Sequence, residues 1–82
     1  MEKNLSVVRD SFKELPNNIE AEQAVIGSIL VSNEIFDDLS LIISSANFYD
    51  PMHQKIFGAI EGLIYKGLLA NPITLKNHFE NE

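Results

Sequence analysis

The sequence predicts an all-α fold, a compact small bundle of four to five main helices. Apolar residues recur at spacings of three and four along most of the chain, which is the period of an amphipathic helix. Asp50-Pro51 and Asn71-Pro72 each combine an N-capping residue with a proline suited to the first helical position, so they mark helix starts. No stretch shows the alternation of apolar and polar residues, bounded by turn residues, that is typical of a β-strand. With 82 residues, the chain has room for one small domain.

The first strong helix signal begins at Asn17-Asn18, whose side chains are suited to an N-cap. Glu20 and Glu22 place negative charge in the first turn, where the helix dipole favours it. The apolar face continues to about Val31 and comprises Ile19, Ala21, Ala24, Val25, Ile26, Ile29 and Leu30. Gly27 costs about 1 kcal/mol relative to alanine inside this helix, so we expect another helix to pass close to its backbone.

A second helix is predicted over residues 34–43, capped by Ser32 or Asn33. Its apolar residues follow helical spacing and are Ile35, Phe36, Leu39, Ile42 and Ile43. Residues 44–47 form a connection, after which the aromatic pair Phe48-Tyr49 is expected to lie beneath the core.

The third helix is predicted to begin at Pro51 and to end near Tyr65, because Lys66-Gly67 is typical of a helix C-terminus. Its expected buried stripe is Met52, Ile56, Ala59, Ile60, Leu63 and Ile64, with Phe57 at the flank. The fourth helix follows Asn71-Pro72 and presents Ile73, Leu75 and Phe79.

The domain organisation is predicted to be a tail followed by one globular unit. Residues 1–15 carry a short apolar stripe, Leu5, Val8, Phe12 and Leu15, so they are expected to be flexible or marginally helical. Pro16 ends this segment, and residues 16–82 form the helical globular domain.

Composition excludes several classes of function. Cysteine is absent, which excludes disulfides and thiolate-bound zinc. The net charge of −6 repels phosphate backbones, so no direct nucleic-acid binding is expected. No apolar run reaches the roughly 18 residues of a membrane span, and the N-terminus does not resemble a signal peptide. The expectations are no membrane contact and a cytoplasmic location.

Catalytic machinery is not evident from the motifs. His53 and His78 lie in different predicted helices without a metal-binding motif, and His53 is expected to bond locally or to pack against Tyr49. The acidic residues Glu34, Asp37 and Asp38 are expected to be solvated.

The glycines form no phosphate-binding loop, although the spacing of Gly58 and Gly62 favours close helix packing. The serines lack a nucleophile motif. No catalytic, cofactor-binding or metal-binding residue is therefore assigned, and the partner-binding residues stay unknown.

Three separated motifs carry a resemblance to a known family. Residues 15–30, LPNNIEAEQAVIGSIL, resemble the opening of DnaB-family helicases, which typically read P-x-N/D-x-E-A-E-x-x-V/L-L/I-G-x-L/I-L. Asn47-Phe48-Tyr49, followed by His53 and Ile56-Phe57, is similar to the family pattern D-F-Y followed by H-x-x-I-F, and residues 73–75 are similar to its I-T-L element. The resemblance covers about residues 15 to 79. Asn71 stands where the family usually has Asp, and both residues cap helices.

This resemblance implies a fragment of an ATP-dependent 5′ to 3′ DNA helicase of the primosome. In the family, the N-terminal helical domain forms a collar on a hexameric ring and communicates with primase and, in some systems, with a helicase loader. ATP and magnesium belong to a separate C-terminal domain, so the fragment itself is not expected to be an enzyme. The dimerising helical hairpin of the family also lies beyond this sequence, so the isolated chain is expected to be monomeric.

Parts of the sequence are also compatible with other functions. A DNA-binding helix-turn-helix would need a basic recognition helix, and six Lys and Arg are spread over the whole chain. The helicase-binding domain of a primase resembles the predicted fold, although the Glu20-Ala21-Glu22-Gln23 string favours the helicase. Another acidic helical interaction module is the remaining alternative, while a small acidic enzyme has no candidate residues.

Overall fold

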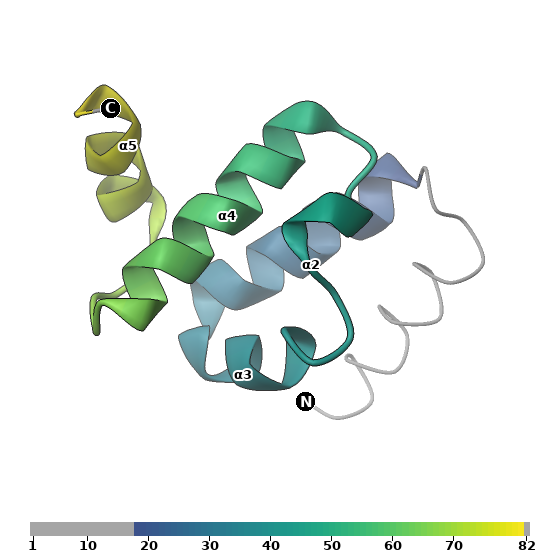
Figure 1. Cartoon of the computed structure of the whole chain (residues 1–82), viewed down its shortest axis with the longest axis horizontal. Helices are drawn as coiled ribbons and strands as arrows, with labels where there is room; N and C mark the ends of the chain where they lie inside the picture. Colours follow the sequence, from purple (N-terminus) through teal and green to yellow (C-terminus); the bar gives the residue numbers. More distant parts are fainter. Residues whose placement is uncertain (1–17, 82) are drawn as a thin grey trace.

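The computed structural model describes residues 18–81, which contain helices and no strand, so the predicted all-α fold is confirmed (Figure 1). The predicted tail, residues 1–15, lies outside the described residues. The elements in chain order are α2 (Ile19–Val31), the 3₁₀ turn η1 (Asn33–Ile35), α3 (Phe36–Leu39), the 3₁₀ turn η2 (Ser45–Asn47), α4 (Pro51–Tyr65) and α5 (Pro72–Glu80).

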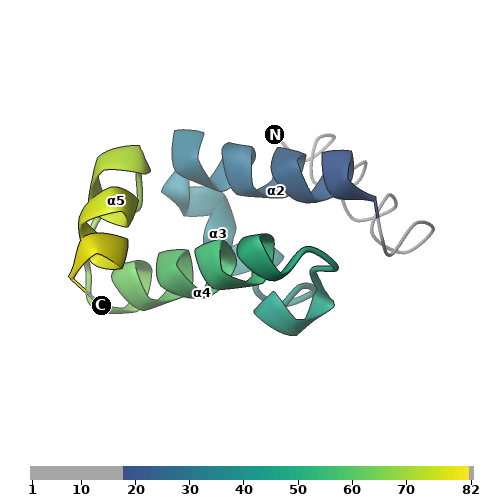
Figure 2. The same cartoon turned by 90° about the horizontal axis from the view of Figure 1, so that it is seen from above.

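Helices α2 and α4 lie side by side and run in the same direction, and α5 crosses the end of the domain at which both finish (Figures 1 and 2). Two parallel neighbours need a connection that returns along the domain. The segment from η1 through α3 and η2 makes that return and covers one side of the α2–α4 pair (Figure 1).

The predicted caps are confirmed at the starts of α2, α4 and α5, whereas the predicted cap at Ser32 or Asn33 is wrong, because neither η1 nor α3 has a side-chain cap bond. Asn18 Oδ1 accepts a hydrogen bond from the Ala21 N–H at 3.0 Å, and Asp50 Oδ1 accepts one from the Met52 N–H at 2.8 Å. Asn71 Oδ1 accepts from two backbone N–H groups of α5 at 2.9 Å each. These bonds satisfy donors that the first turn of a helix leaves without a partner, so each helix begins where the cap stands.

The predicted end of α4 is also confirmed. Gly67 has φ of +78°, the left-handed conformation that glycine adopts without steric cost. Its N–H bonds the Ile64 carbonyl at 2.9 Å, and the Leu68 N–H bonds the Leu63 carbonyl at 2.9 Å. This pair of bonds is a Schellman motif, which turns the chain toward α5.

The predicted second helix over residues 34–43 is wrong in its length. Residues 33–35 form a 3₁₀ turn, and the α-helix itself covers only four residues, Phe36–Leu39. Leu41 and Ile42 bond the carbonyls three residues before them, which tightens the chain into a turn. The chain must turn here to reach the start of α4. As a result Ile42, predicted as buried, is 43% exposed.

Three phenylalanines form the centre of the core. The ring centroid of Phe57 lies 5.6 Å from that of Phe36 and 5.0 Å from that of Phe48. The prediction placed Phe57 at the flank of α4, but its side chain is fully buried, whereas Met52 is 57% exposed. The inward face of α4 therefore runs through His53, Phe57 and Ile60, so the predicted stripe was wrong for Met52 and Phe57.

The same core includes Val25, Ile26, Ile29, Leu39, Ile43, Leu63, Ala70 and Leu75. On α5, Leu75 is buried and Phe79 is half-buried, while Ile73 is 71% exposed. Ile73 occupies the first turn of α5, directly after the cap and Pro72, and points away from the core that Leu75 enters.

Two predictions based on glycine are wrong. A Cβ added to Gly27 would meet no atom within 4 Å, and the same is true at Gly58 and Gly62. No neighbouring helix therefore needs glycine at these three positions. Gly27 is exposed, because α2 turns its opposite face toward α4.

Candidate functional site

A buried carboxylate on α2 is the most unusual group of the described residues. Glu22 is 1% exposed although it is ionisable, and it shares the inward face of α2 with Ala21, Val25 and Ile26. From its place in the sequence, Glu22 was predicted only to put negative charge in the first turn of the helix, and its burial was missed. Burial of an ionised carboxylate is costly unless its oxygens accept hydrogen bonds.

Three donors converge on the Glu22 carboxylate. Its Oε2 accepts a hydrogen bond from the Tyr49 N–H at 2.6 Å, and its Oε1 accepts one from the Asp50 N–H at 3.2 Å. The Nδ1 atom of His53 lies 2.8 Å from Oε1. A carboxylate can only accept, so Nδ1 carries the proton of this bond. We call these four residues the Glu22 network.

The Glu22 network corrects the expectation for His53, which was a local bond or packing against Tyr49. The bond of His53 crosses 31 positions of sequence to α2, and its ring meets Phe48 edge-on at 6.4 Å and 74°. Tyr49 supplies its backbone N–H to Glu22, while the residue is 65% exposed, so its predicted burial beneath the core is wrong. Phe48 is buried, as predicted.

The geometry gives the Glu22 network a structural role. It joins α2 to the chain just before α4 and to the first turn of α4, and Gln54 Nε2 adds a bond to the Phe48 carbonyl at 2.7 Å. Every buried side-chain nitrogen and oxygen of the described residues has a hydrogen-bond partner. Buried polar groups that are fully bonded fix one arrangement of the elements around them.

A second polar cross-link lies at the other end of α2. The Asn33 amide accepts a hydrogen bond from the Ala70 N–H at 2.8 Å and donates to the Ala70 carbonyl at 2.9 Å and the Ile29 carbonyl at 2.8 Å. Asn33 was predicted only as a possible helix cap. Its side chain instead ties the end of α2 to the loop before α5.

The remaining candidate residues lie apart from both cross-links. His78 packs against the ring of its neighbour Phe79 at 5.3 Å. Glu34, Asp37 and Asp38 are exposed, as predicted. Within residues 18–81, no group of three His, Cys, Asp or Glu residues is arranged to hold a metal ion. The helices of this region are also too short or too polar to cross a membrane.

Comparisons with known proteins agree with the three motifs. Residues 14–82 match the family model described as the DnaB-like helicase N terminal domain. The chain is 46% identical to the replicative DNA helicase DnaB of Rickettsia typhi over 74 residues, which are 90% of the chain and 14% of that protein. It is 38% identical to the replicative DNA helicase DnaB of Buchnera aphidicola over 80 residues, which are 98% of the chain and 17% of that protein.

The chain thus spans about a seventh of the length of the relatives it matches. A more distant relative, the replicative DNA helicase DnaB of Treponema pallidum, is 32% identical over 66 residues, which are 80% of the chain and 15% of that protein. No solved structure matches the chain. Because these matches are to helicases, the alternative of a primase domain is not favoured.

Proposed function

The chain belongs to the family of DnaB-like helicase N-terminal domains, and on that premise we propose that it is a non-catalytic assembly and docking domain. The observation that carries the proposal is the inward direction of several motif residues. Glu22 and His53 bond each other inside the fold, Phe57 fills the core, and Thr74 completes the cap of α5. These motif residues thereby build part of the scaffold, whereas Tyr49 and Ile73 of the same motifs are exposed and belong to the surface available for contacts with partners.

The surface supports this role through its exposed apolar side chains. Among the described residues, nine large hydrophobic residues are substantially exposed: Val31, Leu41, Ile42, Tyr49, Met52, Tyr65, Leu68, Leu69 and Ile73. Exposed apolar area of this kind is typical of protein contact surfaces when it gathers in patches. We propose that such contacts assist hexamer assembly of the parent helicase and its communication with primase and, in some systems, a helicase loader.

We propose that the parent protein unwinds duplex DNA in the 5′ to 3′ direction at the replication fork. ATP and magnesium would act in its C-terminal domain, outside the 82 residues, and the location would be the cytoplasm. Calorimetry with the cognate primase tests the docking role, with the full-length parent titrated beside the 82-residue chain. We expect both to bind, the chain more weakly. Binding by the parent alone would place the primase contact outside this domain.

The isolated chain is expected to be monomeric and not to bind DNA directly. Light scattering at micromolar concentration tests the first expectation, and a stable dimer would contradict it. Titration with single- and double-stranded DNA near 50 mM salt, where phosphate attraction is strong, tests the second. Tight binding there would contradict the assignment of an acidic protein-docking domain.

A further inference from the structure

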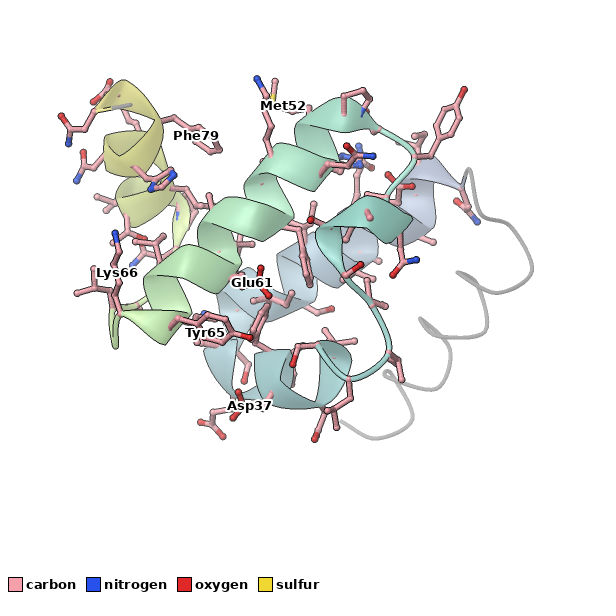
Figure 3. The ribbon with its side chains drawn as sticks, viewed as in Figure 1. Asp37, Met52, Glu61, Tyr65, Lys66 and Phe79 are labelled. Carbon is pink, nitrogen blue, oxygen red and sulfur yellow. The ribbon has the colours of Figure 1, made fainter. Side chains whose placement is uncertain are left out.

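An exposed tyrosine lies between two carboxylates on the face formed by α3 and α4 (Figure 3). Tyr65 is 72% exposed, and its ring meets the buried ring of Phe36 edge-on at 6.3 Å and 82°. Glu61 precedes Tyr65 by one turn of α4, and Asp37 follows Phe36 on α3. We call Asp37, Glu61 and Tyr65 the acidic tyrosine face. The contact with Phe36 holds the aromatic ring in place while most of it stays open to a partner.

The charge of this face is not neutralised by the described part of the chain. Residues 18–81 contain eight Asp and Glu against three Lys, a net charge of −5. Neither Asp37 nor Glu61 forms an ion pair within these residues, where the pair of Glu22 with His53 is the one within 4 Å. Lys66 follows Tyr65 in sequence, but it lies toward the α5 end, away from Asp37 and Glu61 (Figure 3). The face therefore presents negative potential around an aromatic ring.

We propose that the acidic tyrosine face docks an arginine-bearing segment of a partner protein. A guanidinium can stack on the open side of the Tyr65 ring and form hydrogen bonds to a flanking carboxylate at the same time. Lysine fits less well, because its ammonium is compact and more strongly hydrated. This inference rests on the proposed function, since it names the surface and the chemistry by which a docking domain takes its partner.

Charge complementarity selects this occupant over two others. A second copy of the chain carries the same net negative charge, so two such faces repel each other. Nucleic acid is repelled by the same carboxylates. A basic protein segment gains both from the carboxylates and from the aromatic ring. Electrostatic attraction of this kind raises the association rate and is screened by salt.

The test is a nuclear magnetic resonance titration of the 82-residue chain with three blocked, alanine-based helical peptides of about 15 residues. They carry arginine, lysine or glutamate at the same positions, spaced four apart so that the charges share one face. We expect the arginine peptide to give saturable shifts confined to residues around Asp37, Glu61 and Tyr65. The lysine peptide should bind more weakly, and the glutamate peptide should give no saturable shift.

Matched variants separate the site from general charge attraction. Tyr65→Leu should weaken arginine-peptide binding about two- to fivefold, from a cation–π contribution of about 0.5–1 kcal/mol. Glu61→Gln should weaken it as well without touching the Phe36 contact, so it serves if Tyr65→Leu disturbs the fold. The controls are Tyr49→Leu, at another exposed tyrosine just before the N-cap of α4, and Glu20→Gln on α2, and both variants should bind like the unchanged chain.

Shifts spread over the whole surface, or equal weakening by Glu61→Gln and Glu20→Gln, would overturn the proposal. So would equal binding of the arginine and glutamate peptides. Binding of the unchanged chain and of the Tyr65→Leu variant to the cognate primase separates this proposal from the proposed function. Equal primase binding by both would refute the acidic tyrosine face and leave the docking role intact. Site-specific peptide binding without primase binding would refute the primase-docking role and leave the acidic tyrosine face intact.

Discussion

Replacement of Glu22 by glutamine tests the structural role of the Glu22 network. The amide keeps one oxygen but places an NH₂ group where the second carboxylate oxygen accepted a hydrogen bond. One donor, such as the Tyr49 N–H at 2.6 Å, would then face another donor inside the fold. The two contacts to Oε1, from Asp50 and His53, would lose the charge of their acceptor.

The magnitude follows from these three bonds. A hydrogen bond to a charged group contributes about 1.5–3 kcal/mol, so loss of one bond and weakening of two should lower the free energy of unfolding by about 2–4 kcal/mol. The total free energy of unfolding of a domain of this size is roughly 4–12 kcal/mol. With a total above the lowest values of that range, the variant still folds at low temperature, and its melting temperature should be lower by at least about 8 °C.

Urea unfolding followed by circular dichroism measures the effect, with an unchanged m-value showing that the same surface unfolds. The matched control is Glu20→Gln, which removes the same charge from an exposed side chain two residues earlier in α2. Only the interaction with the helix dipole is lost there, about 1 kcal/mol at most. If Glu22→Gln costs no more than Glu20→Gln, the network does not stabilise the fold and the reasoning fails.

Three further predictions concern the backbone and its caps. Gly67→Ala should lower the free energy of unfolding by about 1–2 kcal/mol, because φ is +78° there, whereas Gly27→Ala should raise it by up to about 1 kcal/mol because an added Cβ meets nothing. A lower melting temperature for Gly27→Ala would contradict the open space at that position. Asn33→Ala should lower the free energy of unfolding, measured with urea, by about 2–3 kcal/mol, because both backbone groups of Ala70 lose their partner. An effect under about 0.5 kcal/mol would contradict this. Asn71→Ala should lower the free energy of unfolding by about 1 kcal/mol, because the α5 cap is lost, whereas Asn71→Asp should leave it nearly unchanged. Thermal melting measures both variants, and an equal loss of stability in the two would refute the prediction.

Local signals in the sequence predicted the helix starts and the end of α4. The caps at Asn18, Asp50 and Asn71 bond backbone groups two or three residues away, so the pattern that encodes each cap is contained in a few positions. Gly67 acts over a similar distance. The length of α3 was predicted less well, because a helical apolar spacing over residues 35–43 does not show where the tertiary fold requires the chain to turn.

The two polar cross-links were missed because they join residues far apart in sequence. His53 lies 31 positions from Glu22, and Ala70 lies 37 positions from Asn33. The sequence did contain one indication that Glu22 is buried. Glu22 precedes Val25 and Ile26 by three and four residues, so it falls on the apolar stripe of α2. A carboxylate on such a stripe indicates a buried partner, although it does not say which residue provides it.

Substitutions of the buried pair Glu22 and His53 and substitutions in the acidic tyrosine face should affect partner binding in different ways. Glu22 and His53 lie in the motifs that relate the chain to DnaB helicases, whereas Asp37, Glu61 and Tyr65 lie outside them. Changes to the first pair should reduce partner binding only by unfolding the domain, so binding should recover on cooling to temperatures at which the variant is folded. Changes to the acidic tyrosine face should reduce binding at every temperature, with the fold intact. Family membership and partner preference would then depend on separate sets of residues, so that one scaffold can serve helicases with different partners.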